Sequence, residues 1–316
     1  MENRKLIKFG NSSYVISIPK QWMQKNNLNK GDLVYFTENG SNELILTPSN
    51  NQEQRVKLQD VTINIEGKNF NDIKREIVSS YIRNVHLIKI EGKNLDKKVR
   101  EIRKYLSNLM ALEVVEQNKD KIIAKDFLNM KKISMFQTIK KVDAIVDSML
   151  RDSQHMFETD SYESLMVRDE DVNRLVNMVL RVSRYVMRKP HLIGNTGLTP
   201  FDFFKYLQVA DNLERLGDEA KRLARYLRKV EVDDAGKREI VALYGEICDN
   251  YRNVMESFYN NDVERALELA TKDGSIRERC DALSMKHSSC TYICVVAEKL
   301  KAMDYSIHSI GREVYQ

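Results

Sequence analysis

The stretch ADNLERLGDEAKRLA, residues 210–224, has the period of an amphipathic helix. On a helical wheel of about 100° per residue, the apolar side chains of this stretch lie on one side, and Leu227, just beyond the stretch, lies on the same side. These side chains are Leu213, Leu216, Ala220, Leu223 and Leu227. Three carboxylates, Asp211, Glu214 and Asp218, lie on the opposite side. The stretch predicts a helix that packs its apolar face against other helices and carries an acidic face.

The acidic face has two interpretations. In the first it is a solvated, ion-paired surface, because Asp211 and Asp218 each lie four residues before an arginine, an order that stabilises helices. In the second the carboxylates bind a metal ion, which requires more ligands from a second acidic segment. The segment VRDEDVNRL, residues 167–175, is the candidate, with Asp169 as its first acid. Spacing alone favours the ion-paired surface.

The whole of residues 127–316 shows helical patterning. The full chain has only 4 Pro and 12 Gly, and both residues interrupt helices. The main break is RKPHLIGNTGLTPF, residues 188–201, and further breaks are predicted around Gly236 and Gly274. These breaks predict helix hairpins in an all-α bundle. We expect no enzyme, because the sequence contains no Glu-x-x-His, GxxxxGK, HExxH or GxSxG motif.

Cys290 and Cys294 lie four residues apart in HSSCTYICVVAEKL, with His287 three residues before the first cysteine. One interpretation is a zinc site on a helix face. The other is a pair of buried thiols that act as small hydrophobic side chains. We favour buried thiols, because a structural zinc site normally has a fourth protein ligand and this helix is apolar.

Residues 56–126 contain an internal repeat. The pentapeptide IEGKN occurs at residues 65–69 and 90–94, and each copy predicts a strand, a glycine turn and an amphipathic helix. ALEVVEQNKDKIIAKDF then predicts a β-hairpin. The order is βαβαββ, with parallel pairing and one helical layer. Each glycine turn either binds phosphate at a helix N-terminus or simply makes a tight turn before a capped helix. We favour the tight turn.

Residues 1–48 predict short strands and turns. Gly10-Asn11-Ser12 separates two apolar runs, Pro19 opens a short helix over residues 20–27, and Asn39-Gly40 is a hairpin turn. About fifty residues are few for a stable core, so we expect a second copy to complete it. Trp22 either contacts nucleic acid or packs this small core, and we favour the core.

Charge is concentrated in the same segment. The chain has a net charge of +5, and residues 1–30 alone account for it with six basic residues and one acid. This is the pattern expected of a nucleic-acid contact. The sequence shows neither a secretory h-region nor an apolar run of about 20 residues. We therefore expect a cytoplasmic protein without membrane insertion, with its four cysteines reduced.

Residues 8–48 resemble the AbrB/SpoVT swapped-hairpin family. The marks are Ile18-Pro19, Leu28, Gly31-Asp32 and the closing ELILTP. The resemblance implies a homodimer, intertwined through residues 1–50, that presents basic residues to DNA. The candidate DNA contacts are Arg4, Lys5, Lys8, Asn11, Ser12, Tyr14 and Lys20. Met23 and Gln24 stand where some members of this family carry a pair of arginines.

The helical region resembles PhoU, a phosphate-uptake regulator built from two three-helix repeats. YLQVADNLERLGDEAKRLA is similar to the third-helix signature and VRDEDVNRL to the second helix. Residues 264–283 and 295–310 resemble the second repeat. The resemblance implies iron or zinc at a surface acidic cluster of Asp169, Glu214 and Asp218. In the second repeat Asp273 and Asp304 remain, but Arg277 and Leu300 replace their partners.

The complete chain resembles the archaeal type that joins an AbrB-like head to a PhoU-like tail. We predict a multidomain α+β protein: a swapped-hairpin β domain (1–50), a small α/β domain (56–126) and an all-α bundle of two three-helix repeats (130–316). The implied function is phosphate-responsive regulation of phosphate uptake through DNA. The alternative is an adaptor that docks on a phosphate transporter ATPase or sensor without binding DNA. An oxidoreductase that uses a surface iron cluster is the weakest interpretation.

Overall fold

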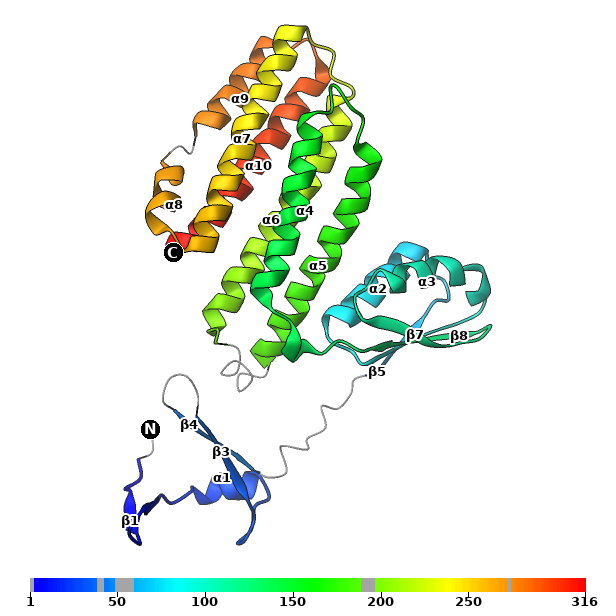
Figure 1. Cartoon of the computed structure of the whole chain (residues 1–316). Helices are drawn as coiled ribbons and strands as arrows, with labels where there is room; N and C mark the ends of the chain where they lie inside the picture. Colours follow the sequence, from blue (N-terminus) through cyan, green and yellow to red (C-terminus); the bar gives the residue numbers. More distant parts are fainter. Residues whose placement is uncertain (1–2, 39–42, 49–59, 189–196, 272–273) are drawn as a thin grey trace. The chain divides into compact units, whose positions relative to one another are not determined.

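The computed structural model describes residues 3–38, 43–48, 60–188, 197–271 and 274–316. The chain divides into two compact units, Met1–Gln59 and Asp60–Gln316. The boundary lies between residues 59 and 60, shortly after residue 56, where the α/β domain was predicted to begin. The predicted α/β domain and helical domain, in contrast, belong to one compact unit (Figure 1).

The first unit has the predicted order of elements. Strands β1 (Ile7–Phe9) and β2 (Ser13–Val15) pair antiparallel, as do β3 (Val34–Glu38) and β4 (Leu44–Pro48). Between the two pairs lies α1 (Lys20–Lys25). The helix ends two residues earlier than predicted, because Asn27 adopts a left-handed conformation with φ of 53°. The predicted Asn39-Gly40 turn lies outside the described residues.

This unit buries little of its own apolar surface. Among its described residues, Leu28 and Pro48 are the buried apolar residues, and Trp22 is half-buried. Several large apolar side chains are more than half exposed: Leu6, Ile7, Phe9, Tyr14, Leu33, Phe36 and Leu44. An isolated copy therefore lacks the hydrophobic burial that stabilises a small domain.

The second unit begins with a four-stranded sheet in the order β5-β6-β8-β7. The elements in chain order are β5 (Asp60–Asn64), α2 (Phe70–Ile82), β6 (Leu87–Glu91), a 3₁₀ turn η2 (Leu95–Lys97), α3 (Val99–Ser107), β7 (Leu112–Gln117) and β8 (Lys121–Asp126). As predicted, β5 and β6 are parallel, and β7 and β8 form a hairpin. Strand β8 inserts antiparallel between β6 and β7. Helices α2 and α3 cover the same face of the sheet (Figure 1).

The two IEGKN segments form tight turns, as the favoured interpretation predicted. Gly67 and Gly92 have φ of 72° and 141°, which a side chain would strain. The Asn69 side chain caps α2 by accepting a hydrogen bond from the Asp72 amide at 3.0 Å. The Gly92 amide donates to a backbone carbonyl of the β7–β8 hairpin at 3.3 Å. The turn geometry thus has a structural explanation without a bound phosphate.

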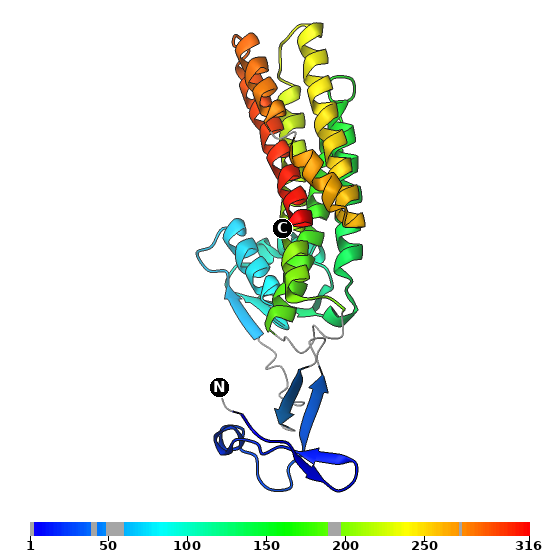
Figure 2. The same ribbon diagram turned by 90° about the vertical axis from the view of Figure 1, so that its left-hand side faces the viewer.

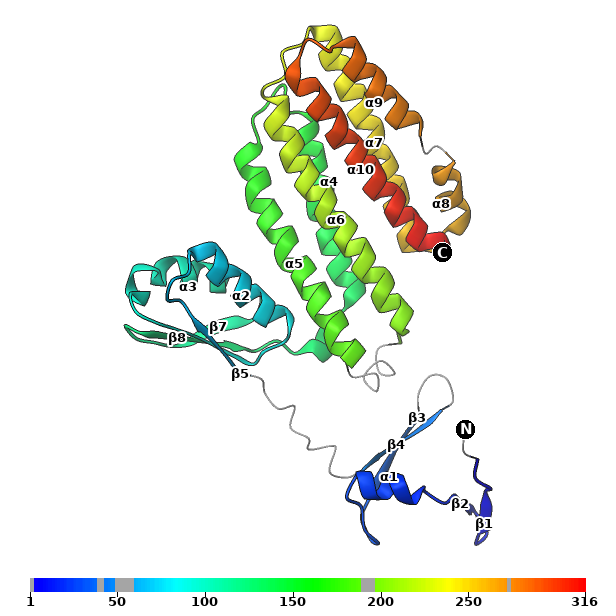
Figure 3. The ribbon, with the colours of Figure 1, turned by 180° about the vertical axis from the view of Figure 1, so that it is seen from behind.

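The remaining residues form the helical bundle. A 3₁₀ turn η3 (Met130–Lys132) precedes α4 (Met135–Gln154), α5 (Tyr162–Arg188), α6 (Pro200–Leu227), α7 (Asp234–Asn260), α8 (Val263–Ala270), α9 (Ser275–Lys286) and α10 (Thr291–Tyr315). Helices α4, α5 and α6 make one three-helix repeat, and α7, the pair α8–α9 and α10 make the second. Helix α6 lies between α5 and α10 (Figure 3). Figure 2 shows the long helices running roughly along one direction. One continuous apolar core joins both repeats.

The predicted breaks coincide with real helix ends, and three more occur. Thr199 and Asp202 form a reciprocal capping box at the start of α6. Residues 189–196 of the predicted main break lie outside the described residues. Gly236 falls within the first turn of α7 rather than in the break itself. Unpredicted breaks follow α4, α7 and α9.

The expectation of two buried thiols in the last helix is wrong. Cys294 is exposed, and Cys290 is half-buried at the N-cap of α10. Because α10 begins at Thr291, its period turns Ile293, Val296 and Ala297 inward and leaves Cys294 outside. Within the part of the chain that the structure describes, no helix is both long and apolar enough to cross a membrane.

Candidate functional site

The first unit presents the predicted DNA contacts as exposed side chains. Lys8 in β1 lies directly opposite Tyr14 in β2, so the two side chains share one face of the ladder. Asn11 and Ser12 lie in the connecting turn. Lys20 is the first residue of α1, away from this ladder in sequence. Arg4 and Lys5 precede β1, and both are exposed.

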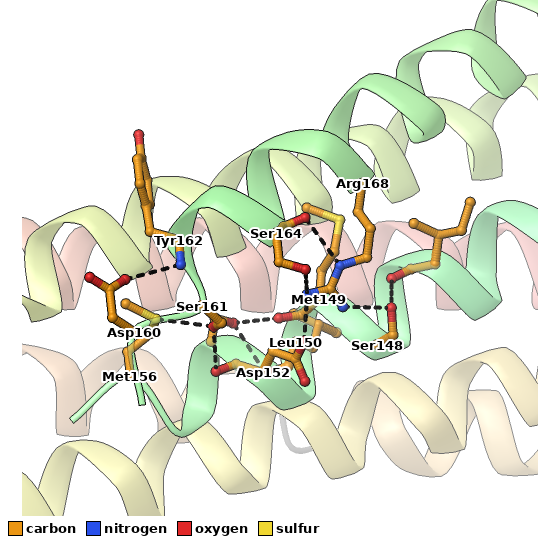
Figure 4. Close-up of polar contacts among 12 residues, drawn as sticks. Ser148, Met149, Leu150, Asp152, Met156, Asp160, Ser161, Tyr162, Ser164 and Arg168 are labelled. Carbon is orange, nitrogen blue, oxygen red and sulfur yellow. Dashed lines mark hydrogen bonds and ion pairs between the residues drawn. The ribbon is translucent and has the colours of Figure 1, made fainter. Parts of the chain in front are cut away.

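In the second unit, the position of α5 is set by contacts at its start (Figure 4). The Arg168 guanidinium donates to Ser148 Oγ at 2.9 Å and also binds the Asp152 carboxylate, both on α4. Ser164, one turn earlier on α5, accepts a further bond from the same guanidinium at 3.2 Å. These contacts fix the rotation of α5. Since neighbouring residues on a helix point about 100° apart, they also direct Asp169 toward α6.

Asp169 and Asp218 meet at one ammonium group. Lys221 Nζ donates to Asp169 Oδ2 at 2.6 Å and to Asp218 Oδ1 at 2.8 Å. The second oxygen of Asp218 accepts from Arg222 at 3.0 Å. Asp169 is only 9% exposed, although the resemblance implied an acidic cluster on the surface. The structure thus brings together Asp169 of α5 and Asp218 of α6 and places the Lys221 ammonium between them.

Glu214 lies one turn before Asp218 and is half-buried. Burial raises its pKa, and the nearby carboxylates Asp211, Asp218 and Asp169 raise it further. Asp211 itself pairs with Arg215 at 3.0 Å, as the helix spacing predicted. Glu214 forms no hydrogen bond or ion pair with another described residue, so it is the uncompensated acid of the cluster.

The pKa values of the other two carboxylates, Asp169 and Asp218, are shifted in opposite directions. Burial raises the pKa of Asp169, and the hydrogen bond and charge of Lys221 only partly offset this. Burial also acts to raise the pKa of Asp218, but Lys221 and then Arg222 outweigh it and hold that pKa below its ordinary value. The ammonium pKa of Lys221 is raised by its two carboxylate partners, which outweigh its own burial. Lys221 therefore stays charged at neutral pH.

The carboxylates of Asp169 and Asp218 form a site that suits a cation, and the Lys221 ammonium is that cation in the structure. Oxygen ligands lie about 2.0–2.2 Å from zinc, so a metal bound by Asp169 and Asp218 would need the space that the ammonium occupies. Among the described residues, no group of three or more His, Cys, Asp and Glu side chains is arranged to hold a metal ion. The predicted site fits a metal only if Lys221 turns away.

The prediction from the sequence did not include Lys221, although its spacing from Asp218 is visible in residues 210–224. Lys221 follows Asp218 by three residues, a spacing at which helical side chains meet. The same helix carries Glu219, which pairs with Arg222 at 2.6 Å and with Lys299 of α10 at 3.1 Å. Asp211 and Asp218 of the acidic face thus pair with cations of their own helix, whereas the buried Glu219 also pairs with a cation of the second repeat.

Comparison with known proteins identifies two segments. Residues 7–54 match the family model described as antidote-toxin recognition MazE, bacterial antitoxin. Residues 139–227, which span most of α4 and all of α5 and α6, match the PhoU domain. No curated protein and no solved structure matches the chain.

Both matched families are regulatory and non-enzymatic. The head of the chain is a MazE/AbrB-type domain, and its first three-helix repeat is a PhoU domain. The predicted combination of an AbrB-type head with a PhoU-like bundle is confirmed. The second repeat, α7 to α10, lies beyond the matched segment and is defined by its helices. Asp169, Glu214 and Asp218 all lie within the PhoU match, whereas Arg4 and Lys5 precede the MazE match.

Proposed function

We propose that this protein is a cytoplasmic, phosphate-responsive regulator of phosphate uptake that binds DNA as a homodimer. The head supplies the DNA contact, and the PhoU-type bundle senses phosphate status or engages a transporter partner. The observation that carries the proposal is the union of a MazE/AbrB-type head with a PhoU domain in one chain. Lys8 and Tyr14, side by side on an exposed ladder, support a DNA contact.

The homodimer is proposed from the apolar surface of the head. Ile7, Phe9, Phe36 and Leu44 are each 58–69% exposed, although they lie on β-strands. A second copy that covers these strands would remove them from water, which is a favourable term of roughly 25 cal/mol per Å². Mass measurement of the intact chain by light scattering tests this proposal, and a monomer at micromolar concentration would contradict it.

DNA binding is tested on the intact chain with fluorescently labelled duplexes, one from upstream of the protein's own gene and one of random sequence. Each phosphate neutralised by a side chain contributes about −0.9 to the slope of log affinity against log salt. We expect Lys5→Glu/Lys8→Glu to lower the magnitude of this slope by about 4, because a homodimer carries four such lysines, and to weaken binding. The control Lys119→Glu/Lys141→Glu reverses two exposed lysines of the second unit. If both pairs have the same effect, or if no salt-sensitive binding occurs, the DNA proposal fails.

The alternative is an adaptor whose head only dimerises. The observation in its favour is that Met23 and Gln24 occupy the places of the arginine pair found in some DNA-binding members of the head's family. An adaptor would bind a phosphate transporter ATPase or sensor equally well with and without Lys5→Glu/Lys8→Glu. A regulator would lose DNA binding in the same variant.

Iron or zinc at Asp169, Glu214 and Asp218 remains a prediction. Elemental analysis of the purified protein beside Glu214→Ala/Asp218→Ala tests it directly. If Lys221 competes with the metal, Lys221→Met should raise the metal content above that of the unaltered protein. Equal metal content in all three proteins would remove this site.

A further inference from the structure

An open cleft of about 580 Å³ lies where the α/β part meets the first helical repeat. Helix α2 supplies most of its lining, with Lys74, Arg75, Val78 and Ile82 among the residues. Tyr105 of α3 and Arg184 of α5 complete it. The cleft lies within one compact unit, and its volume is in the range typical of sites for small organic ligands, about 300–1,000 Å³.

The charges around this cleft have one sign. Three cations line it, and no acidic side chain is among the described lining residues. Arg75 has an 81% exposed side chain and shares one long contact of 3.3 Å with Asp72. Lys74 lies over the Tyr105 ring, 4.8 Å from its centroid, and neither Lys74 nor Arg184 pairs with a carboxylate of the described residues. Such a concentration of positive charge attracts anions.

Another cleft of the α/β part has a different charge pattern. It lies at the ends of β5 and β6 and mixes signs, with Glu66, Glu91 and Asp120 beside three lysines. Two lysines elsewhere in this part form ion pairs: Lys68 with Glu76 at 2.5 Å and Lys121 with Glu116 at 2.7 Å. Of these two clefts, the α2–α5 cleft is therefore the one whose charged lining residues are all cations.

A buried contact holds the two walls of the cleft in place. Arg181, one turn before Arg184 on α5, is fully buried and pairs with Asp126 at the end of β8. Its guanidinium stacks on Tyr81 of α2, 3.8 Å from the ring centroid, and its Nε donates to Asn84 at 2.9 Å. This contact fixes α5 against the C-terminal end of α2. Arg184 is thus positioned across from Lys74 before any ligand arrives.

We propose that this cleft binds a nucleoside phosphate. The phosphate oxygens accept charge-assisted hydrogen bonds from Lys74, Arg75 and Arg184. The organic body covers the exposed parts of Val78 and Ile82, which a bare phosphate ion would leave in water. The ligand contacts both α2 and α5, so it strengthens the attachment of the α/β part to the first repeat. The site lies wholly in the second unit and does not depend on DNA binding by the head.

The test uses the full-length chain and four probes without added divalent metal: AMP, ATP, adenosine and inorganic phosphate. Calorimetric titration gives the affinities, and thermal unfolding gives the stabilisation. Lys74→Gln and Arg184→Gln each remove one charge from the cleft. The matched controls are Lys141→Gln and Arg238→Gln, which remove exposed charges from bundle helices. Circular dichroism confirms that all four variants are folded.

We expect AMP and ATP to bind and to raise the melting temperature, and adenosine and inorganic phosphate to bind at least about tenfold more weakly. Lys74→Gln and Arg184→Gln should each weaken nucleotide binding by about tenfold, because each removes a hydrogen bond to a charged group. The two control variants should bind as the unaltered protein does.

Three results would overturn the proposal. The first is the absence of AMP and ATP binding at millimolar concentration. The second is nucleotide binding that survives Lys74→Gln and Arg184→Gln unchanged. The third is an affinity for adenosine or for inorganic phosphate equal to that for AMP, because one half of the cleft would then have no part in recognition.

Discussion

Replacing Lys221 with methionine tests the central contact of the acidic cluster. Methionine keeps much of the side-chain length but removes the ammonium that both Asp169 and Asp218 bind, at 2.6 and 2.8 Å. Asp218 would keep its bond from Arg222, at 3.0 Å. Asp169 would keep one weak side-chain contact from Asn173, at 3.3 Å. Asp169 therefore carries most of the loss.

The expected cost lies between two known limits. An exposed ion pair contributes about 0–1 kcal/mol, while breaking a fully buried pair costs about 3–5 kcal/mol. The side chains of Asp169 and Lys221 are 12% and 18% exposed, so the pair is largely but not wholly buried. We expect Lys221→Met to lower the free energy of unfolding by about 1–3 kcal/mol at pH 7. Each kcal/mol corresponds to a fall in Tm of about 2–4 °C in a domain of 150–250 residues.

The pH dependence supplies a second, independent prediction for the same variant. Asp169 already has a raised pKa, and loss of Lys221 raises it further. A carboxyl group whose pKa is higher in the folded than in the unfolded state destabilises the fold above that folded pKa, and protonation removes the penalty. Asp218 loses part of the attraction that lowers its pKa, and that loss also matters only while it is ionised. The deficit of Lys221→Met should therefore shrink as the pH falls toward the ordinary aspartate pKa of 3.8.

Thermal unfolding followed by circular dichroism between neutral and mildly acidic pH measures both effects. Lys141→Met is the control, since Lys141 is exposed on α4 and such surface changes stay within about 0.5 kcal/mol. Adding Asp169→Asn to Lys221→Met should recover most of the lost stability, because the uncompensated charge disappears. The reasoning is refuted if Lys221→Met costs no more than Lys141→Met, or if its deficit is the same at every pH.

Two further predictions concern the α/β part. Arg181→Met leaves Asp126 nearly buried without its partner and should cost about 3–5 kcal/mol in a thermal unfolding experiment; a loss below about 1 kcal/mol would contradict the buried pair. Gly92→Ala should destabilise the protein more than Gly67→Ala, its counterpart in the other IEGKN copy, by about 1–3 kcal/mol. Both positions have positive φ, but a Cβ at Gly92 would lie 2.9 Å from the Ile65 side chain, whereas Gly67 faces open space; equal Tm values for the two variants would contradict this difference.

The fold follows from local signals in most places. Helix periodicity and turn residues predicted the βαβαββ part and the bundle. Thr199 and Pro200 were assigned to the break at residues 188–201, although they begin α6 as its N-cap and first residue. The residues that follow α7 also indicate a helix break, which was not predicted. Asn261 takes a left-handed conformation with φ of 51°, and Asp262 caps α8, so the Asn-Asp pair is a recognisable C-cap and N-cap.

The side chains of the sites pair with residues that are distant in the sequence, and the sequence did not predict these pairs. Arg181 is a charged residue within an otherwise apolar face, so local rules place it in solvent. Its burial depends on Asp126, 55 residues earlier, and on the ring of Tyr81. Lys221 meets Asp218 through local helix spacing, but its contact with Asp169 depends on the packing of α5 against α6. Pairs of this kind follow from packing between elements, which periodicity does not specify.

The two repeats neutralise their corresponding aspartates differently, and this bears on the metal prediction. Asp218 on α6 takes its cations from its own helix, whereas Asp304 on α10 is 1% exposed and has both Arg277 of α9 at 3.7 Å and His308 of its own helix at 3.4 Å. Asp273, the counterpart of Asp169 that the resemblance implies in the second repeat, lies outside the described residues.

The position one turn before each aspartate separates the repeats further. Glu214 precedes Asp218 and is an acid without a partner among the described residues, whereas Leu300 precedes Asp304 and is fully buried. A carboxylate-bound metal needs several oxygen ligands, and an apolar residue at this position removes one of them. Any metal held on this face should therefore occur once per chain, in the first repeat, and should compete with Lys221 for the same carboxylates.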